Sequence, residues 1–376
     1  MKKALIIILA LVVIVVLVIL ATLDRGGSEE AVRIGILLPL TGPAANHGQD
    51  SLNAIRLRLA EIEESGGPHI TVVVEDSQSN PTQALSAFQK LTDIDNVPVI
   101  IGPISSSIVL GLGPVANQRK IPMIAIGSSS PKITKAGPYV YRHALLAETQ
   151  SAELARYAKN IIGTSQVAFF YMNDETGLGY ANRFRKVYER LGGKVVAEET
   201  FDRDSRDYRT QLTKLKGSGA TVVFSPGIPS STGYLLKQSA ELGYSCTVLA
   251  GYGVEGQDII TIAGDEGRRL IYTSMPYDQA FLSAYEDRYG KAATAGAGLA
   301  YDVMGILAKA VSGGARTPDE FKRFLDTERG FEGATGILEF DANGDTQKSP
   351  LIFKTVSRGK FVSTVSLKQQ ASPEGE

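Results

Sequence analysis

The feature that most constrains the fold of this chain is a repeated alternation between short apolar segments and longer amphipathic segments. The first half contains strand-like apolar runs at 33–38, 70–74, 97–104, 121–127 and 139–142. The second half repeats the pattern, with strand-like runs at 167–171, 194–201, 220–225 and 248–251. The stretches between these runs show the spacing of apolar residues that is typical of helices. Alternating strands and helices predict parallel sheets with helices on both faces, and two such series predict two α/β lobes.

The chain continues with further helical patterns and closes with a hairpin-like region. A helical pattern occupies 299–310, and residues 317–320 form a capping box that opens another helix. Asn343 and Gly344 have the composition of a tight turn between strands. Strand-like segments surround that turn at 336–340, 351–356 and 361–365.

Length and composition exclude several classes of protein. A chain of 376 residues suggests two domains or one bilobed unit. The 39 basic and 40 acidic residues give a net charge of -1, which argues against a nucleic-acid partner. A hydrophobic content of 43% is sufficient for a packed core. Cys246 is the single cysteine, so no disulfide can form within the chain.

The N-terminus carries an uncharged apolar run at 4–23, after Lys2 and Lys3. Its length is about that needed to span a bilayer, whereas the core of a signal peptide is usually about 7–15 residues long. Ile19 lies at the -3 position relative to Ala21, where signal cleavage needs a small residue. We therefore expect an uncleaved membrane anchor, with a cleaved signal peptide as the alternative. Both place the remaining chain outside the cytoplasm.

Two neighbouring strand-like runs end in clusters of serines. The run at 97–104 leads into Ser105, Ser106 and Ser107, and the run at 121–127 leads into residues 128–130. The carboxyl ends of parallel strands face the ligand crevice of an α/β sheet. Hydroxyls and free backbone N–H groups at that edge suit a small anion such as a carboxylate. The alternative is that these serines only cap helices.

Patterns that carry catalysis or metal binding are missing from the sequence. The three histidines, His47, His69 and His143, do not have the spacing of metal ligands. Neither a nucleophile elbow nor a phosphate-binding loop is present. The segment 341–345 resembles the start of a calcium loop but lacks the required glycine at the sixth position and the glutamate at the twelfth. We therefore expect a binding protein without a cofactor or metal, rather than an enzyme.

Motifs that follow successive strands carry a resemblance that extends over residues 32–365. These motifs are Leu40-Thr41-Gly42-Pro43, Glu75-Asp76 with Asn80-Pro81, 102–107, 127–131, 173–179, Asp207-Tyr208, Ala300-Tyr301-Asp302 and 340–345. In this order and spacing they resemble type I periplasmic solute-binding proteins of the Leu/Ile/Val-binding family, which serve ABC transporters.

The resemblance implies two doubly wound lobes that are joined by three crossings and hold a ligand in the cleft between them. Residues 1–30 then form the signal peptide or membrane anchor with a linker. The expected first lobe is 31–147 with 272–328, the second is 148–271 with 329–368, and residues 369–376 are a frayed tail.

Carried onto this sequence, the resemblance assigns roles to residues of the first lobe. Ser106 matches a serine that holds an amino-acid carboxylate, with Ser105 beside it. Ser129 matches a hydroxyl residue that contacts both the carboxylate and the ammonium, and Gly127 offers a backbone carbonyl to the ammonium. His47 falls where the family often has an aromatic residue that lines the cleft.

The second lobe departs from the family pattern. Thr176 stands where many relatives have a tyrosine against the ligand. In the family, an acidic residue pairs with the ligand ammonium, and a gapless match puts Gly253 at its position. Glu255 fits this role after a shift of two residues, and Asp174 is the next candidate. Tyr252 is a candidate to line the cleft.

The resulting expectation is an extracytoplasmic protein that binds an amino acid, such as a branched-chain one, or a similar small carboxylate, and delivers it to an ABC transporter. The expected partners are the permease subunits of that transporter and, through the N-terminal helix, the membrane. A ligand-sensing module that docks on a membrane receptor is the alternative function.

Overall fold

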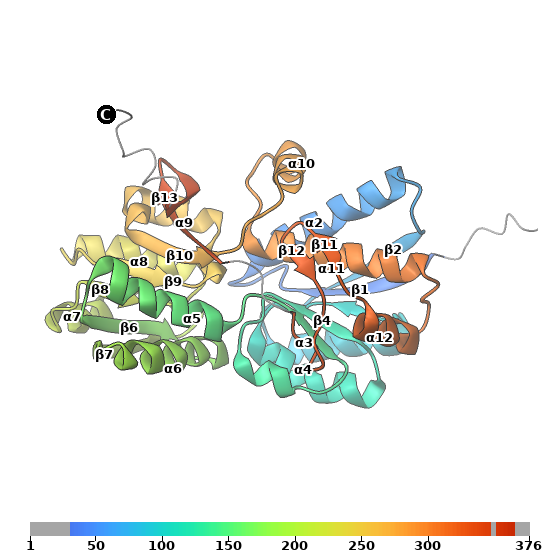
Figure 1. Cartoon of the computed structure of the whole chain (residues 1–376), viewed down its shortest axis with the longest axis horizontal. Coiled ribbons are helices and arrows are strands. Elements are labelled where there is room, and N and C mark those ends of the chain that lie inside the picture. Colours follow the sequence, from blue (N-terminus) through green and yellow to red (C-terminus); the bar gives the residue numbers. More distant parts are fainter. Residues whose placement is uncertain (1–30, 347–350, 365–376) are drawn as a thin grey trace, which may run out of the picture.

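Two lobes lie side by side in the computed structural model, which describes residues 31–346 and 351–364 (Figure 1). Each lobe contains a sheet of mainly parallel strands between layers of helices. The predicted α/β class with two parallel sheets is therefore confirmed.

The first lobe is built on a five-stranded parallel sheet with the order β2-β1-β3-β4-β5. Its strands are β1 (Val32–Leu38), β2 (Ile70–Asp76), β3 (Ile100–Ile101), β4 (Met123–Ile126) and β5 (Val140–His143). The central strands β3 and β4 are buried along their whole length. Their continuous apolar sequence is what a parallel strand requires when helices cover both faces of its sheet.

Helices from both ends of the chain cover the first sheet. One face packs against α2 (Ala45–Glu64) and α11 (Ala295–Ser312), and the other face packs against α3 (Pro81–Gln89) and α4 (Ser106–Arg119). The remaining elements of this lobe are α10 (Gln279–Tyr289), α12 (Pro318–Thr327), β11 (Phe331–Gly333) and β12 (Gly336–Leu338). The hydrophobic core of the first lobe thus needs residues that are far apart in the sequence.

The second lobe contains a seven-stranded sheet with the order β14-β13-β10-β9-β8-β6-β7. Its strands are β6 (Gln166–Met172), β7 (Lys194–Phe201), β8 (Val222–Phe224), β9 (Thr247–Ala250), β10 (Leu270–Ser274), β13 (Ile352–Ser357) and β14 (Lys360–Ser363). Its helices are α5 (Ala147–Arg156), α6 (Glu175–Arg190), α7 (Arg209–Gly217), α8 (Pro229–Glu241) and α9 (Gln257–Ala263). The strands β6 to β10 are parallel and repeat the strand order of the first sheet, while β13 and β14 are antiparallel.

The chain passes between the lobes after β5, after β10 and again after Thr346. The predicted division gave residues 329–368 to the second lobe and began the return to the first lobe at residue 272. In the structure, β10 remains in the second sheet, and the segment 331–346 packs on the first lobe. The segment 331–346 packs on the first lobe because this buries its apolar side chains. Phe340, for example, packs edge-on against Tyr141 with ring centroids 5.2 Å apart.

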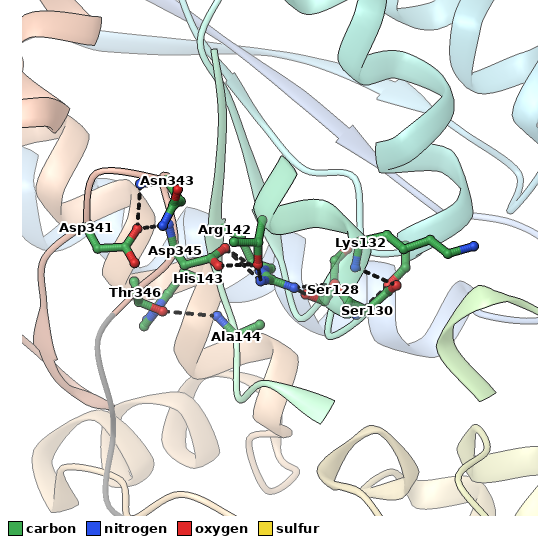
Figure 2. Close-up of polar contacts among 12 residues, drawn as sticks. Ser128, Ser130, Lys132, Arg142, His143, Ala144, Asp341, Asn343, Asp345 and Thr346 are labelled. Carbon is green, nitrogen blue, oxygen red and sulfur yellow. Dashed lines mark hydrogen bonds and ion pairs between the residues drawn. The ribbon is translucent and has the colours of Figure 1, made fainter. Parts of the chain in front are cut away.

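A buried ion pair fixes this returning segment to the first lobe (Figure 2). Arg142 is 1% exposed, and its guanidinium contacts Asp345 at 2.7 Å. The same guanidinium donates to the carbonyl of Ser130 at 2.6 Å. Thr134 donates to the second carboxylate oxygen of Asp345 at 2.6 Å. One arginine therefore joins the end of β5, the serine loop after β4 and the segment that leaves for the second lobe.

Within the part of the chain that the structure describes, no helix is both long and apolar enough to cross a bilayer. The predicted anchor at 4–23 lies outside the described residues, as does the predicted tail at 369–376.

We predict that Arg142→Met lowers the free energy of unfolding by about 3–5 kcal/mol, because the buried carboxylate of Asp345 then has no cationic partner. Urea denaturation measures this loss. Arg156→Met is the matched control, since Arg156 pairs with Glu153 on the surface and such pairs contribute about 0–1 kcal/mol. Equal losses in the two variants would contradict the proposed importance of the buried pair.

Candidate functional site

A cavity of about 90 Å³ lies between the two lobes. It is lined by residues that follow β1 to β4 in the first lobe and β6 to β9 in the second. In parallel α/β sheets this edge is where ligands bind. A cavity needs about 10–15 Å³ to hold one water, so this one has room for roughly six to nine groups of that size. The cavity therefore has room for a small molecule such as an amino acid.

The N-terminus of α4 forms one wall of this cavity. Ser105 is the N-cap residue, and its hydroxyl contacts Ser107 at 3.0 Å instead of capping a backbone N–H group. The first N–H groups of a helix have no partner within it, and the helix dipole favours negative charge at this end. Ser106 is the first helical residue and is buried, with its hydroxyl accepting from the backbone N–H of Ser130 at 3.3 Å. This wall can therefore hold a small anion.

The two serine loops are held together by direct hydrogen bonds. Ser128 donates to the carbonyl of Ile104 at 2.5 Å, which joins the loop after β4 to the loop after β3. Gly127 begins the second loop with a φ of +77°, a left-handed conformation that side chains rarely adopt. This turn places Ser129 on the cavity wall beside Ser106.

Two buried tyrosines from the second lobe complete the polar wall. Tyr252 donates its hydroxyl to the carbonyl of Gly127 in the opposite lobe. The hydroxyl of Tyr180 interacts with Ser129 and Gln150. Burial raises the pKa of both tyrosines well above the ordinary value, so both remain neutral hydrogen-bond donors at physiological pH.

Polar contacts hold the lobes against each other on both sides of the cavity. Asn46 in α2 donates to Asp258 in α9 at 2.8 Å. Lys132, which follows the serine loop, contacts Glu175 at the start of α6 at 2.6 Å. Together with the bond between Tyr252 and Gly127, these contacts show that the structure is in a closed arrangement.

The structure brings together most of the site residues that the sequence suggested. The residues among them that line the cavity are His47, Ser105, Ser106, Gly127, Ser129, Thr176 and Tyr252. They come from both lobes, although the sequence signal was strongest in the first.

Glu255 is the exception, because it does not line the cavity. Its side chain is 2% exposed, accepts from Ser274 at 3.0 Å and forms an ion pair with Lys354 on β13. Asp174, the next acidic candidate, is also engaged, since it caps α6 and binds Arg203 at 2.8 Å. The predicted role of Glu255 as partner of a ligand ammonium is therefore not supported by its position.

Several cavity residues were missed by the reasoning from sequence. Ser77 and Ser79 follow β2, Arg203 follows β7, and Tyr180 lies in the second turn of α6. The rule that pointed to the serine clusters, namely that ligands meet the carboxyl ends of parallel strands, applies equally to Ser77 and Arg203. For Tyr180 no local pattern distinguishes a cavity residue from a core residue.

Apolar side chains form the remaining wall. They are Ile104, Ile108, Ile126, Met172 and Ile228. The arrangement combines an anion-binding end with an aliphatic surface, which suits a small organic acid. Within residues 31–346 and 351–364, no group of three or more His, Cys, Asp or Glu side chains is placed to hold a metal ion.

His47 is half-buried in the cavity wall with its Nε2 atom fully covered, and this desolvation lowers its pKa against the opposing charge of Asp50. Below about pH 6.5 the unfolded chain takes up a proton on this histidine that the folded chain does not. The unliganded protein should therefore lose stability as the pH falls from 6.5, at up to about 1.4 kcal/mol for each pH unit.

We predict that His47→Gln reduces this loss, as measured by urea denaturation of the unliganded protein at pH 7.5 and 5.5. The exposed His69 provides a control, since His69→Gln should keep the wild-type dependence. An unchanged slope in the His47 variant would show that another group is responsible.

Comparison with known proteins identifies the fold and the family. A family described as periplasmic binding protein matches residues 31–360. The Leu/Ile/Val-binding protein homolog 1 of Brucella abortus is 26% identical over 337 residues, which cover 86% of this chain and 90% of that protein. The resemblance inferred from the sequence motifs is therefore confirmed.

Solved structures agree with this assignment. The leucine-binding protein LivK of Thermotoga maritima is 26% identical and superposes with a TM-score of 0.82, covering 89% of this chain and 97% of that one. The branched-chain amino acid transporter substrate-binding protein LivJ of Streptococcus pneumoniae, in complex with isoleucine, is 25% identical with a TM-score of 0.83, covering 89% and 100%. Proteins of this kind bind solutes outside the cytoplasm for transporters and are not enzymes. Because the match extends over nearly the whole described part, this chain belongs to the periplasmic binding protein family.

Proposed function

We propose that this chain captures an amino acid or a related small carboxylate between its two lobes and delivers it to an ABC-type transporter. The observation that carries this proposal is that Ser106, at the N-terminus of α4, and Ser129, in the loop after β4, both line the cavity between the lobes. The names of relatives add support, since one binds leucine, isoleucine, valine, threonine and alanine, and a solved neighbour holds isoleucine.

The first lobe is the docking surface in this proposal. The carboxylate accepts hydrogen bonds from the hydroxyls of Ser106 and Ser129 and from free N–H groups of α4, so that no buried cation is needed. The aliphatic part then lies against Ile104 and Ile126.

Closure of the second lobe completes the site. The lobes rotate about the crossings, and Tyr252 reaches Gly127 only in the closed form. Closure removes the ligand from water and presents both lobes to the transporter in one fixed arrangement.

The N-terminal segment 4–23 is proposed to anchor the chain in the membrane, near its transporter. In cells that express the full chain, we predict that the protein remains in the membrane pellet and begins with its original N-terminal residues. N-terminal sequencing and alkaline extraction of the pellet test this. A soluble protein that starts shortly after Ala21 would contradict the anchor and support a cleaved signal peptide.

The ligand can be identified by a thermal-shift panel of amino acids, amides and organic acids, because a compound that binds the folded state raises the melting temperature. For the compound with the largest shift, we predict that Ser106→Ala and Ser129→Ala each weaken binding roughly ten- to a hundredfold. Each removes a buried hydrogen bond to a charged group, which contributes about 1.5–3 kcal/mol.

Ser86→Ala is the matched control for these variants, since Ser86 donates to the carbonyl of Thr82 within α3 and does not line the cavity. Calorimetric titration of all three variants compares them directly. If the two cavity variants bind as tightly as the control, the carboxylate site lies elsewhere.

A further inference from the structure

The wall of the interlobe cavity carries neutral and positive polar groups. Among the described residues that line it, none is an aspartate or a glutamate. Arg203 is the charged side chain in this lining, and it binds Asp174 at 2.8 Å. The cavity therefore offers a carboxylate ligand several donors, but offers an ammonium group no negatively charged partner.

The acidic residues near the cavity lie outside its lining, and most have partners of their own. Glu148 acts electrostatically on Tyr180 and has a buried Oε2 without a hydrogen bond, but it does not line the cavity. Four of them are engaged as follows: Asp174 with Arg203, Glu255 with Lys354, Asp258 with Asn46, and Asp50 with Lys291. In three of these pairs the partner is a cation, so moving the carboxylate toward a ligand would leave a lysine or arginine unpaired. For the pair of Glu255 and Lys354, whose carboxylate is 2% exposed, removal of one partner is strongly unfavourable.

The groups without a partner in the cavity wall are neutral. Nε2 of His47 and the hydroxyls of Ser77 and Ser79 are buried and make no hydrogen bond in the structure. The carbonyl of Gly127, which the family resemblance assigned to an ammonium, accepts the hydroxyl of Tyr252. These groups can satisfy a hydroxyl by hydrogen bonding, but they do not balance a full positive charge.

We propose that the cavity selects small aliphatic carboxylates that carry a neutral hydroxyl at the second carbon, in preference to the corresponding amino acids. This inference rests on the proposed function, because it takes Ser106 and Ser129 as the carboxylate site. It specifies the substrate class more narrowly, since a zwitterion would bring a buried ammonium into a cavity without a compensating charge.

The test is calorimetric titration of the full chain with three matched pairs of compounds. These are L-alanine with L-lactate, L-valine with L-2-hydroxyisovalerate, and L-leucine with L-2-hydroxyisocaproate. Within each pair the carbon skeleton and the carboxylate are the same, so the difference in affinity reports the substituent. We expect the hydroxy acid to bind at least tenfold more tightly than its amino acid in every pair that gives measurable binding.

The outcomes separate this inference from the function on which it rests. If an amino acid binds as tightly as its hydroxy acid or more tightly, the inference is overturned and the proposed carboxylate capture stands. If none of the six compounds binds, the proposed function itself fails for small aliphatic carboxylates, and the inference fails with it.

A substitution at Gly253 should reverse the preference for hydroxy acids over amino acids. It lines the cavity, its φ lies outside the left-handed region, and an added Cβ meets the carbonyl oxygen of Gly227 at an ordinary 3.5 Å. Gly253→Glu therefore introduces the missing carboxylate, and we expect it to shift the preference at least tenfold toward the amino acid. Gly253→Gln has nearly the same size without the charge and should keep the wild-type preference. Equal shifts in both variants would contradict the role of charge.

Discussion

The ion pair between Arg142 and Asp345 joins three segments of the molecule that lie far apart in the sequence or in different loops. Arg142 is the next-to-last residue of β5, and Asp345 lies where the chain is about to leave for the second lobe. The carbonyl of Ser130 accepts from the same guanidinium, so the position of the serine loop depends on this pair. A charged group this deeply buried is tolerated only when its partners satisfy it, and this requirement fixes the geometry of all three segments.

The cavity is divided chemically as well as spatially between the lobes. The first lobe supplies serine hydroxyls and a helix N-terminus, which are suited to an anion of any small organic acid. The second lobe adds Thr176, Arg203 and Tyr252 to the cavity wall. Under the proposed function the carboxylate is held by the first lobe, so substitutions in the second lobe can change the preferred ligand without disturbing the carboxylate site.

Local sequence patterns were sufficient for the fold and for the first half of the site. Ser106 and Ser129 could be found because each follows a buried parallel strand, and the strand ends of one sheet meet at one edge. Glu255 was misplaced because its partner, Lys354, lies 99 residues further along the chain, and no local pattern reveals such a pairing. The segment 331–346 was assigned to the wrong lobe for the same reason, since Asp345 in this segment pairs with Arg142, which lies 203 residues earlier in the chain.

The interleaving of the lobes has a consequence for how the protein is made. All five strands of the first sheet have been synthesised once the chain reaches His143, but α11, which covers one face of this sheet, begins about 150 residues later. At a synthesis rate of about 5–20 residues per second, that apolar face waits roughly 8–30 s for its cover. Until α11 is made, the first lobe lacks part of the cover on one face of its sheet and cannot reach its final packing. An incompletely packed chain is easier to thread across a membrane than a finished domain.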